Sequence, residues 1–376
     1  MHILVIPDSF KGSLTANEVA RVMYDVIQSI FPKATCELFP FSDGGEGGLD
    51  VLKNSINGQT INCQTINAIG EKISAPYFLF ENGKSAWIEL SQSSGLSQLT
   101  ASQRNPLITS TYGTGLQVLD ALNKGCENIY LGIGGSCTHD IATGIFTALG
   151  GRLLTNNGEE VQPIGGNLTS ISSIDFGSLS PLVKQANWIV ACDVTNPLSG
   201  PTGAAYTYAS QKGADNIAIQ KLEEGSIHFG NLLNKLFNRD VFNLVGGGAA
   251  GGVSAGLNGL FGSKIENGFD ILSKITDLEK KIQKADLILT GEGCFDKQSM
   301  HGKLPYRIAK IAQQFDILTY IIAGQADLKE IAELSVLHIE QTKNDDMSIE
   351  DAMYKAEDLL RDKLIEILSK INPRKC

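Results

Sequence analysis

The sequence has little proline, few aromatic residues and no long apolar run. Its 11 prolines stand against 40 glycines among 376 residues, and such an excess of glycine is typical of tight strand-to-helix turns rather than of extended linkers. Apolar stretches such as Ile3–Ile6 and Leu287–Leu289 fall far short of the ~20 residues that a membrane-spanning helix needs. We therefore expect no membrane insertion.

Basic residues are also in deficit. The chain has 31 Lys and Arg against 41 Asp and Glu, a formal net charge of -10. A nucleic-acid-binding protein needs a basic face that releases counterions from phosphates, so this composition argues against one. A small anionic ligand remains compatible, because local lysines and backbone N–H groups are enough to bind it.

Cysteine and histidine patterns are equally sparse. The seven cysteines include no C-x-x-C pair, and the N-terminus lacks the basic region and the long apolar core of a secretion signal. We expect reduced thiols and a cytoplasmic location. The five histidines form no H-x-x-x-H pair, so a zinc site has no support.

Strand and helix patterns alternate at the start of the chain. Ile3–Ile6 predicts a buried strand, and Thr15 with Glu18 predicts a capping box ahead of a helix. A second strand is predicted over Cys36–Phe41 and leads into another helix. This order implies a parallel sheet with right-handed crossovers.

The middle of the chain has a different pattern. Residues 58–90 contain short β-like pieces with an Asn82-Gly83 hairpin turn, and the strand-helix pattern returns towards the C-terminus. We therefore predict an α/β protein with one domain inserted into another. Residues 1–60 and 260–376 would form the first domain, and residues 61–259 the inserted one.

Acidic residues follow several of the predicted strands. Asp8, Asp43, Asp193 and Glu292 each come directly after one, and loops at the carboxyl edge of an open parallel sheet line its ligand crevice. For any single residue, capping of a helix is about as good an explanation. Four such residues, each beside glycine or serine, favour a site.

Two loops have the composition of an anion site. Residues 8–13 combine Lys11 with Gly12 and the hydroxyls of Ser9 and Ser13, ahead of a helix N-terminus. The spacing of a Walker A motif occurs nowhere, and a solvated lysine on a turn is the alternative. Residues 132–136 form a second glycine-rich turn, although tight turns need glycine for positive φ in any case.

Residues 290–303 form the densest polar loop. Glu292 and Asp296 are suited to share a cation or to orient a hydroxyl group, and Lys303 to neutralise a phosphate. Phosphoryl transfer needs carboxylates for Mg²⁺, cations that spread charge, and a base near the acceptor. The loops therefore indicate phosphoryl chemistry.

Two other motif matches are interpreted as chance. Residues 246–251 match G-x-G-x-x-G, but a dinucleotide site also needs a strand ending in an acid about 20 residues on. Glu266 stands near that distance, and we predict no strand over 261–267. Residues 252–256 match G-x-S-x-G around Ser254, with His301 and His338 downstream, but no strand runs directly into this turn.

The motifs taken together resemble the bacterial glycerate kinases of the two-domain type that lack a Walker A loop. The resemblance covers nearly the whole chain, and its motifs occur in the expected order. They are Asp8-Ser-Phe-Lys-Gly-Ser13, Ser42-Asp-Gly-Gly-Glu-Gly47, Ser110-Thr-Tyr-Gly-Thr-Gly115, Gly132-Ile-Gly-Gly-Ser136, Ala191-Cys-Asp-Val-Thr-Asn-Pro-Leu198, Gln211-Lys-Gly-Ala214, Gly248-Ala-Ala-Gly-Gly252, Thr290-Gly-Glu-Gly293 and Gly302-Lys303.

The chain departs from this family at a few positions. The family usually carries Asn-Asp-Gly-Gly where this chain has His139, Asp140, Ile141 and Ala142. It also commonly has a basic residue at the position of Cys294 and a proline near Ser210. These positions flank candidate ligand loops, so affinity or substrate preference is open to change.

The resemblance implies a flavodoxin-like α/β domain interrupted by a second α/β domain, with the active site in the cleft between them. It implies an ATP- and Mg²⁺-dependent enzyme that phosphorylates D-glycerate, with 2-phosphoglycerate favoured as the product and 3-phosphoglycerate as the alternative. An NAD-dependent dehydrogenase and a non-catalytic ligand-binding protein are the remaining alternative hypotheses. The partner is a small molecule, neither nucleic acid nor membrane, and the chain is a monomer or a homodimer.

The resemblance and the loop positions together assign roles. Lys11, Asp43, Asp193 and Glu292 are the predicted catalytic residues, and the last two with Asp296 are the predicted metal ligands. Predicted substrate contacts come from Ser9, Ser13, Gly44, Gly45 and Glu46. Predicted nucleotide contacts come from Gly134, Gly135, Ser136, Gly247, Gly248 and Lys303. Which carboxylate is the base and which binds the metal stays open.

Overall fold

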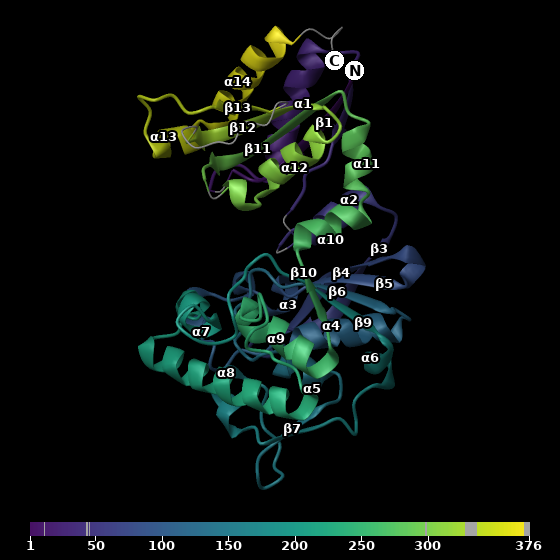
Figure 1. Cartoon of the computed structure of the whole chain (residues 1–376), viewed down its shortest axis with the longest axis vertical. Helices are drawn as coiled ribbons and strands as arrows, with labels where there is room; N and C mark the ends of the chain where they lie inside the picture. Colours follow the sequence, from purple (N-terminus) through teal and green to yellow (C-terminus); the bar gives the residue numbers. More distant parts are fainter. Residues whose placement is uncertain (11, 43, 45, 298, 328–336, 372–376) are drawn as a thin grey trace. The chain divides into compact units, whose positions relative to one another are not determined.

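The chain folds into two compact units, one inserted into the sequence of the other. The computed structural model describes residues 1–10, 12–42, 44, 46–297, 299–327 and 337–371. The first unit combines residues 1–43 with 272–376, and the second consists of residues 44–271 (Figure 1). An inserted domain was predicted, although with limits near residues 60 and 260.

The first unit is built on a five-stranded parallel sheet. Its strand order is β13-β12-β11-β1-β2, and every neighbouring pair is parallel. Numbered along this unit alone, the order is 2-1-3-4-5, which is that of flavodoxin-like folds. The predicted flavodoxin-like sheet is therefore confirmed. The strands are β1 (His2–Pro7), β2 (Thr35–Leu38), β11 (Leu287–Phe295), β12 (Leu318–Ala326) and β13 (Leu337–Gln341).

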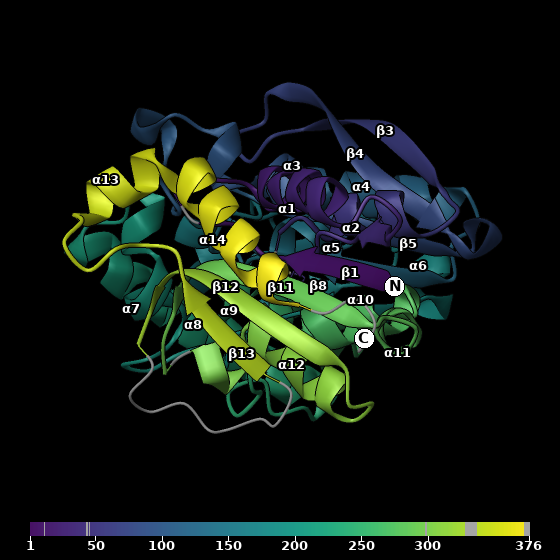
Figure 2. The same cartoon turned by 90° about the horizontal axis from the view of Figure 1, so that it is seen from above.

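Helices cover both faces of this sheet (Figure 2). On one face, Val19 and Met23 of α1 and Leu360 of α14 pack on alternate strand residues such as Ile3. On the other face, α12 packs on β11 and β12 through a cluster that includes Tyr306. The strands are thus apolar on both sides, as expected of a buried parallel sheet. The helices are α1 (Ala16–Ile30), α11 (Leu278–Gln283), α12 (Leu304–Gln313), α13 (Ile349–Tyr354) and α14 (Ala356–Lys370), and α10 (Gly268–Ile275) spans the boundary between the units.

The second unit contains a six-stranded mixed sheet with the order β10-β9-β6-β5-β4-β3. The four strands β5, β6, β9 and β10 are parallel, whereas β4 pairs antiparallel with both β3 and β5. The strands are β3 (Gln59–Ile66), β4 (Lys72–Phe80), β5 (Ser85–Glu89), β6 (Asn128–Gly132), β9 (Asn187–Ala191) and β10 (Lys264–Glu266), with a separate hairpin of β7 (Arg152–Leu154) and β8 (Ser173–Asp175).

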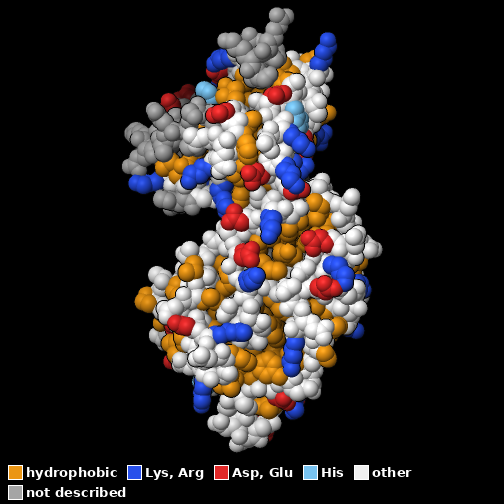
Figure 3. Space-filling view, turned by 45° about the vertical axis from the view of Figure 1, so that its right-hand side comes forward, with side chains coloured by type: hydrophobic (Ala, Val, Ile, Leu, Met, Phe, Trp, Pro, Cys, Tyr) orange, Lys and Arg blue, Asp and Glu red, His pale blue; other side chains and the backbone are white. Residues whose placement is uncertain are grey.

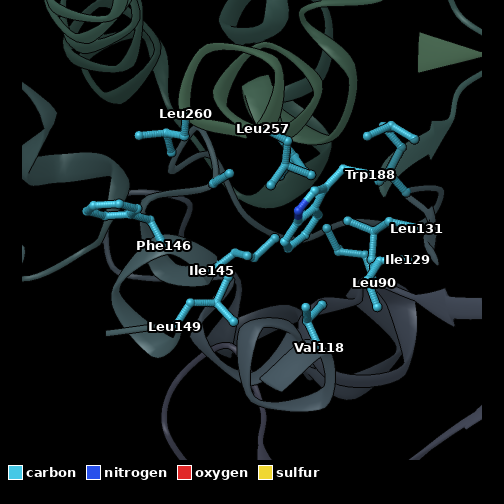
Figure 4. Close-up of a cluster of buried hydrophobic side chains, with 14 of the residues drawn as sticks. Leu90, Val118, Ile129, Leu131, Ile145, Phe146, Leu149, Trp188, Leu257 and Leu260 are labelled. Carbon is cyan, nitrogen blue, oxygen red and sulfur yellow. The ribbon is translucent and has the colours of Figure 1, made fainter. Parts of the chain in front are cut away.

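The largest apolar cluster of the second unit lies between this sheet and its helices. Figure 4 shows Leu131 and Trp188 from the strands facing Val118 of α4, Ile145 of α5 and Leu257 of α9. Full burial of such side chains stabilises the fold by about 1.5–3 kcal/mol each. The helices are α2 (Gly48–Ser55), α3 (Ser91–Ser94), α4 (Tyr112–Asn123), α5 (Thr143–Ala148), α6 (Pro181–Gln185), α7 (Ala204–Tyr208), α8 (Asn216–Phe237) and α9 (Ala249–Phe261).

Contacts of α2 explain where the first boundary between the units falls. The backbone N–H of Leu49 donates to Glu89 Oε1 at 2.9 Å. A Cβ added to Gly48 would lie 2.5 Å from the Trp87 ring. Both partners belong to β5, so α2 is tied to the inserted unit. This tie is tertiary, and the local sequence pattern around residue 60 did not predict it.

Local predictions agree with the structure where a short-range signal was present. Thr15 and Glu18 form the capping box of α1, and β4 and β5 form the hairpin around residues 81–83. The prediction that residues 261–267 contain no strand was wrong. Lys264–Glu266 forms β10, a three-residue strand that exists through its parallel pairing with β9, and so short a run carries no periodic signal of its own.

The charged surface and the cysteines can be compared with the expectations from composition. On the face drawn in Figure 3, acidic and basic side chains are mixed among one another. Over the described part of the chain, no helix combines the length and the apolarity needed to cross a membrane. The six described cysteines, of which Cys294 is exposed, are free thiols.

Candidate functional site

The flavodoxin-like sheet places two predicted acidic residues side by side. Its strand order reverses between β1 and β11, and ligands of open α/β sheets bind at the carboxyl end of such a switch point. Pro7 pairs with Gly291 at this end, and the N–H of Asp8 donates to the Gly291 carbonyl at 2.9 Å. Asp8 and Glu292 are thus neighbours at the switch point. Asp8 follows its strand as predicted, whereas Glu292 was predicted to follow a strand and lies inside β11, which extends to Phe295.

Glu292 is a buried carboxylate with an incomplete set of partners. Its Oε2 accepts from Lys303 Nζ at 3.1 Å, and its side chain is 7% exposed. Within the described residues, its Oε1 has no hydrogen-bond partner. Burial raises the pKa of Glu292, the Lys303 ammonium and the Ser299 hydroxyl group oppose this shift, and the nearby Asp8 carboxylate adds to it. A buried oxygen without a partner costs free energy, and a cation or a ligand hydroxyl group would satisfy it.

Lys303 also links Glu292 to the third predicted metal ligand. Its Nζ lies 3.8 Å from Asp296 Oδ1 and donates to the Cys294 carbonyl at 3.3 Å. Asp296 is further held by the buried Ser299, whose N–H donates to Asp296 Oδ1 at 3.0 Å. The structure therefore brings Glu292, Asp296 and Lys303 together, as the loop composition predicted.

The loop after β1 is a tight turn. Phe10 and Leu14 form an antiparallel bridge, and Ser13 Oγ donates to the Phe10 carbonyl at 3.0 Å. Ser9 is held by Asp8, whose Oδ1 accepts from its N–H at 2.6 Å. Lys11, the predicted catalytic cation, lies outside the described residues.

In the inserted unit, predicted residues gather at the carboxyl ends of the parallel strands. The turn of Gly134, Gly135 and Ser136 follows β6, and Asp193 follows β9. Asp193 is exposed, and its Oδ1 accepts from the N–H of Gly268, which follows β10, at 3.1 Å. The sheet therefore aligns these loops along one edge.

The segment after residue 43 packs on that same edge. Gly44 has φ +93° and lies so close to Gly268 that an added Cβ would be 2.5 Å from the Gly268 Cα. Glu46 lies over the turn after β6, because a Cβ on Gly135 would be 1.6 Å from Glu46 Oε1. Within this unit, the predicted substrate residue Glu46 thus meets Gly135, and Gly44 meets Gly268. Asp43 and Gly45 lie outside the described residues.

Lys212 is a site residue to which the sequence reasoning gave no role. It is 1% exposed, and its Nζ donates to Ser136 Oγ at 2.8 Å and to the Thr138 carbonyl at 2.7 Å. Burial lowers the pKa of Lys212 to about 8. The sequence signal for Lys212 was the Gln211-Lys-Gly-Ala214 motif. Its contact with Ser136 could not be predicted, because the two residues are far apart in the chain.

Gly247 and Gly248 have a packing role in the structure. Their N–H groups donate to the carbonyls of Leu244 and Asn196, both at 2.9 Å, and a Cβ on Gly248 would lie 2.2 Å from the Pro197 carbonyl. Both glycines are buried. Their contact with nucleotide phosphates stays a prediction, and the observed backbone hydrogen bonds do not favour it.

The rival motif interpretations lack their structural context. The glycine-rich segment 246–251 is preceded by irregular backbone over residues 238–245, which contain no strand. A dinucleotide fingerprint, in contrast, follows a strand. Ser254 is fully buried inside α9, whereas a nucleophile elbow exposes its serine at a strand-to-helix turn. The two matches are explained by close packing of the Gly/Ala segment.

The departures at residues 139–142 lie in a buried, strained segment. Ile141 and Ala142 adopt φ values of 51° and 61°, which favour glycine and strain a residue with a Cβ. His139 is fully buried, with Nε2 at 2.9 Å from Ser226 Oγ, and burial lowers its pKa to about 3. These substitutions therefore act on packing behind the turn of residues 134–136.

The described residues do not form a complete metal site. Among the described residues, no three His, Cys, Asp or Glu side chains come together in an arrangement that would hold a metal ion. Glu292 and Asp296 belong to the first unit and Asp193 to the second. The unpartnered Oε1 of Glu292 fits a hard cation, which prefers carboxylate oxygen.

Comparisons with known proteins agree with one another. The model of the glycerate kinase family matches residues 3–372. A glycerate kinase from Halalkalibacterium halodurans is 40% identical over 86% of this chain and 85% of its own length, and glycerate 2-kinase from Escherichia coli is 39% identical over the same shares. The crystal structure of a presumed glycerate kinase 2 from Salmonella typhimurium LT2 has a TM-score of 0.84 and 35% identity, and the match covers 98% of this chain and 97% of that one.

Proposed function

We propose that this chain, which belongs to the glycerate kinase family, transfers the γ-phosphoryl group of ATP to a hydroxyl group of D-glycerate and forms 2-phosphoglycerate. The observation that supports the chemistry is the buried, partly unpartnered Glu292 beside Lys303 and Asp296 at the switch point. Phosphoryl transfer depends on positioning and on charge stabilisation, and these groups provide both.

The proposed roles follow the edges of the two sheets. In the first unit, Glu292 and Asp296 would hold Mg²⁺, and Lys303 and Lys11 would neutralise phosphate oxygens. Bound Mg²⁺ supplies positive charge to the β- and γ-phosphoryl oxygens. Asp193 or Glu292 would accept the proton of the substrate hydroxyl group. A cytoplasmic location is part of the same proposal.

In this proposal, the hydroxyl groups and the carboxylate of glycerate bind at the polar turn of the inserted unit. Asp43 and Glu46 would accept hydrogen bonds from the hydroxyl groups, and the close approach of Gly44 to Gly268 leaves backbone rather than side chains at this edge. Backbone N–H groups bind carboxylates and phosphates well because they need no reorientation. Ser9 and Ser13 remain proposed substrate contacts, although the hydroxyl group of Ser13 already donates to the Phe10 carbonyl.

Turnover by purified protein tests the proposal directly. We expect ADP release from ATP to require both D-glycerate and Mg²⁺. ADP release at the same rate with and without D-glycerate would contradict the proposed reaction.

The position of the transferred phosphoryl group is expected to be the 2-hydroxyl. Enolase consumes only the 2-phospho isomer, so enolase alone as the coupling enzyme should give a continuous signal in the presence of ATP and D-glycerate. The Escherichia coli relative is named a glycerate 2-kinase, which agrees with this choice. A signal that appears only after phosphoglycerate mutase is added would identify 3-phosphoglycerate as the product instead.

Ser254 is expected to be dispensable for turnover. The Ser254→Ala variant should keep kcat and KM within about twofold of the wild type, because the side chain is fully buried inside α9. Steady-state kinetics with D-glycerate provide the measurement. A loss of about a hundredfold, as for a catalytic group, would return the hydrolase interpretation to consideration.

A further inference from the structure

Ser136 receives a hydrogen bond from a buried cation. Lys212 Nζ lies 2.8 Å from Ser136 Oγ. An ammonium group is a donor only, whereas a hydroxyl group has one proton and two lone pairs. The contact therefore uses a lone pair of Ser136 Oγ and leaves the hydroxyl proton for another acceptor. The described residues offer this hydroxyl group no further hydrogen bond, and its residue is 7% exposed.

The charge of Lys212 lacks a direct counter-ion in the described parts of the chain. No carboxylate lies within ion-pair distance of its Nζ, and the 2.7 Å bond to the Thr138 carbonyl is to a neutral group. The titratable groups that face it are Cys137, His139 and Asp140. Asp140 Oδ2 is already held by the N–H of Thr111 at 2.7 Å. A buried ammonium without a paired charge is costly, and a bound anion would compensate it.

The turn in front of this pair already accommodates a carboxylate oxygen. Glu46 Oε1 lies at Gly135, as the 1.6 Å separation from an added Cβ shows. Gly135 has φ +64°, which permits this close approach. Glu46 is exposed and Gly134 and Gly135 are half-buried, so a ligand can reach the turn from solvent.

We propose that Lys212 acts as a positioning residue that fixes Ser136 as a hydrogen-bond donor to an anionic oxygen of a ligand bound at the turn of residues 134–136. The anionic oxygen belongs either to a phosphate of ATP or to the carboxylate of glycerate, which present the same acceptor chemistry. This inference rests on the proposed function, because that function supplies the two ligands.

The test compares Ser136→Ala, Lys212→Met and the double variant with wild type, with Ser93→Ala as the matched control. Ser93 is also buried, and its Oγ bonds only Thr114 among the described residues. A lost hydrogen bond to a charged group corresponds to about a tenfold loss of affinity or more. We expect Ser136→Ala to raise one KM about tenfold with kcat nearly unchanged, and the control to change neither.

The KM that rises identifies the ligand, ATP or D-glycerate. Because Lys212 acts through Ser136, Lys212→Met should add no further increase in KM to the Ser136→Ala variant. Fully additive effects, or unchanged KM values for both ligands in Ser136→Ala, would overturn the proposal. If Lys212→Met fails to fold, the Ser136→Ala result decides alone.

Calorimetric titration with ATP and with D-glycerate separates this proposal from the proposed function. Wild-type protein that binds a ligand without turnover would contradict the kinase reaction. The role of Lys212 and Ser136 would then be tested by ligand affinity, with the same tenfold loss expected in Ser136→Ala. Wild-type protein that binds neither ligand would overturn both.

Discussion

Replacement of Lys11 by methionine is expected to lower kcat/KM about a hundredfold or more and to leave the melting temperature unchanged. Lys11 itself lies outside the described residues, and its proposed role rests on its place in the Asp8-Ser-Phe-Lys-Gly-Ser13 motif. A cation placed against the charge that develops during phosphoryl transfer is worth about 3–4 kcal/mol of barrier in a partly dry site. Methionine keeps most of the apolar stem and removes only the charge. Steady-state kinetics and thermal unfolding on the same preparation measure the two effects.

Lys33 offers a matched control in the same unit. It is an exposed lysine on the turn after α1, and a surface lysine of this kind contributes within about 0.5 kcal/mol to stability. Lys33→Met should therefore match wild type in both measurements. Wild-type kinetics in Lys11→Met would show that this turn is structural and would remove Lys11 from the proposed site.

Replacement of Glu292 by glutamine is expected to lower kcat about a hundredfold or more without loss of stability. As a metal ligand or general base, the carboxylate would contribute on this scale, and the amide cannot replace its charge. The pKa of Glu292 is raised by burial, so the fold favours the protonated form. The stability linked to this group is present below its ordinary pKa and is lost as the pH rises through the raised pKa.

A neutral amide mimics the protonated form, so the melting temperature of Glu292→Gln at pH 7 should equal or exceed that of wild type. Glu223 provides the comparison, since it is a buried glutamate of α8 whose Oε2 also lacks a partner among the described residues and whose pKa is also raised by burial. Glu223→Gln should show the same direction in stability and a kcat within about twofold of wild type. Normal turnover in Glu292→Gln would mean that the carboxylate has only a structural role.

The short-range signals of the sequence were enough for much of the first unit. An apolar run at Ile3–Ile6 and a capping box at Thr15 and Glu18 define a strand and a helix through residues within one turn of each other. Such patterns depend on side chains that are close together in the chain, and the ordered motifs then gave the family. Asp8 and Asp193 were predictable for the same reason, because parallel strands bring their carboxyl ends to one edge. Glu292 was predicted to follow a strand and instead lies within β11.

Contacts between distant residues were decided only by the tertiary structure. The three-residue strand β10 exists through its pairing with β9, and the boundary near residue 43 depends on the bond from Leu49 to Glu89. The placement of Glu46 over Gly135 and of Lys212 beneath Ser136 likewise joins segments that are far apart in the chain. Burial, which sets the direction of the pKa shifts of Glu292 and Lys212, is also a property of the packed fold. The sequence by itself determined which chemical groups stand at the ends of strands, and only the packing decided which of them meet and which are shielded from water, because those contacts depend on how the chain folds back on itself.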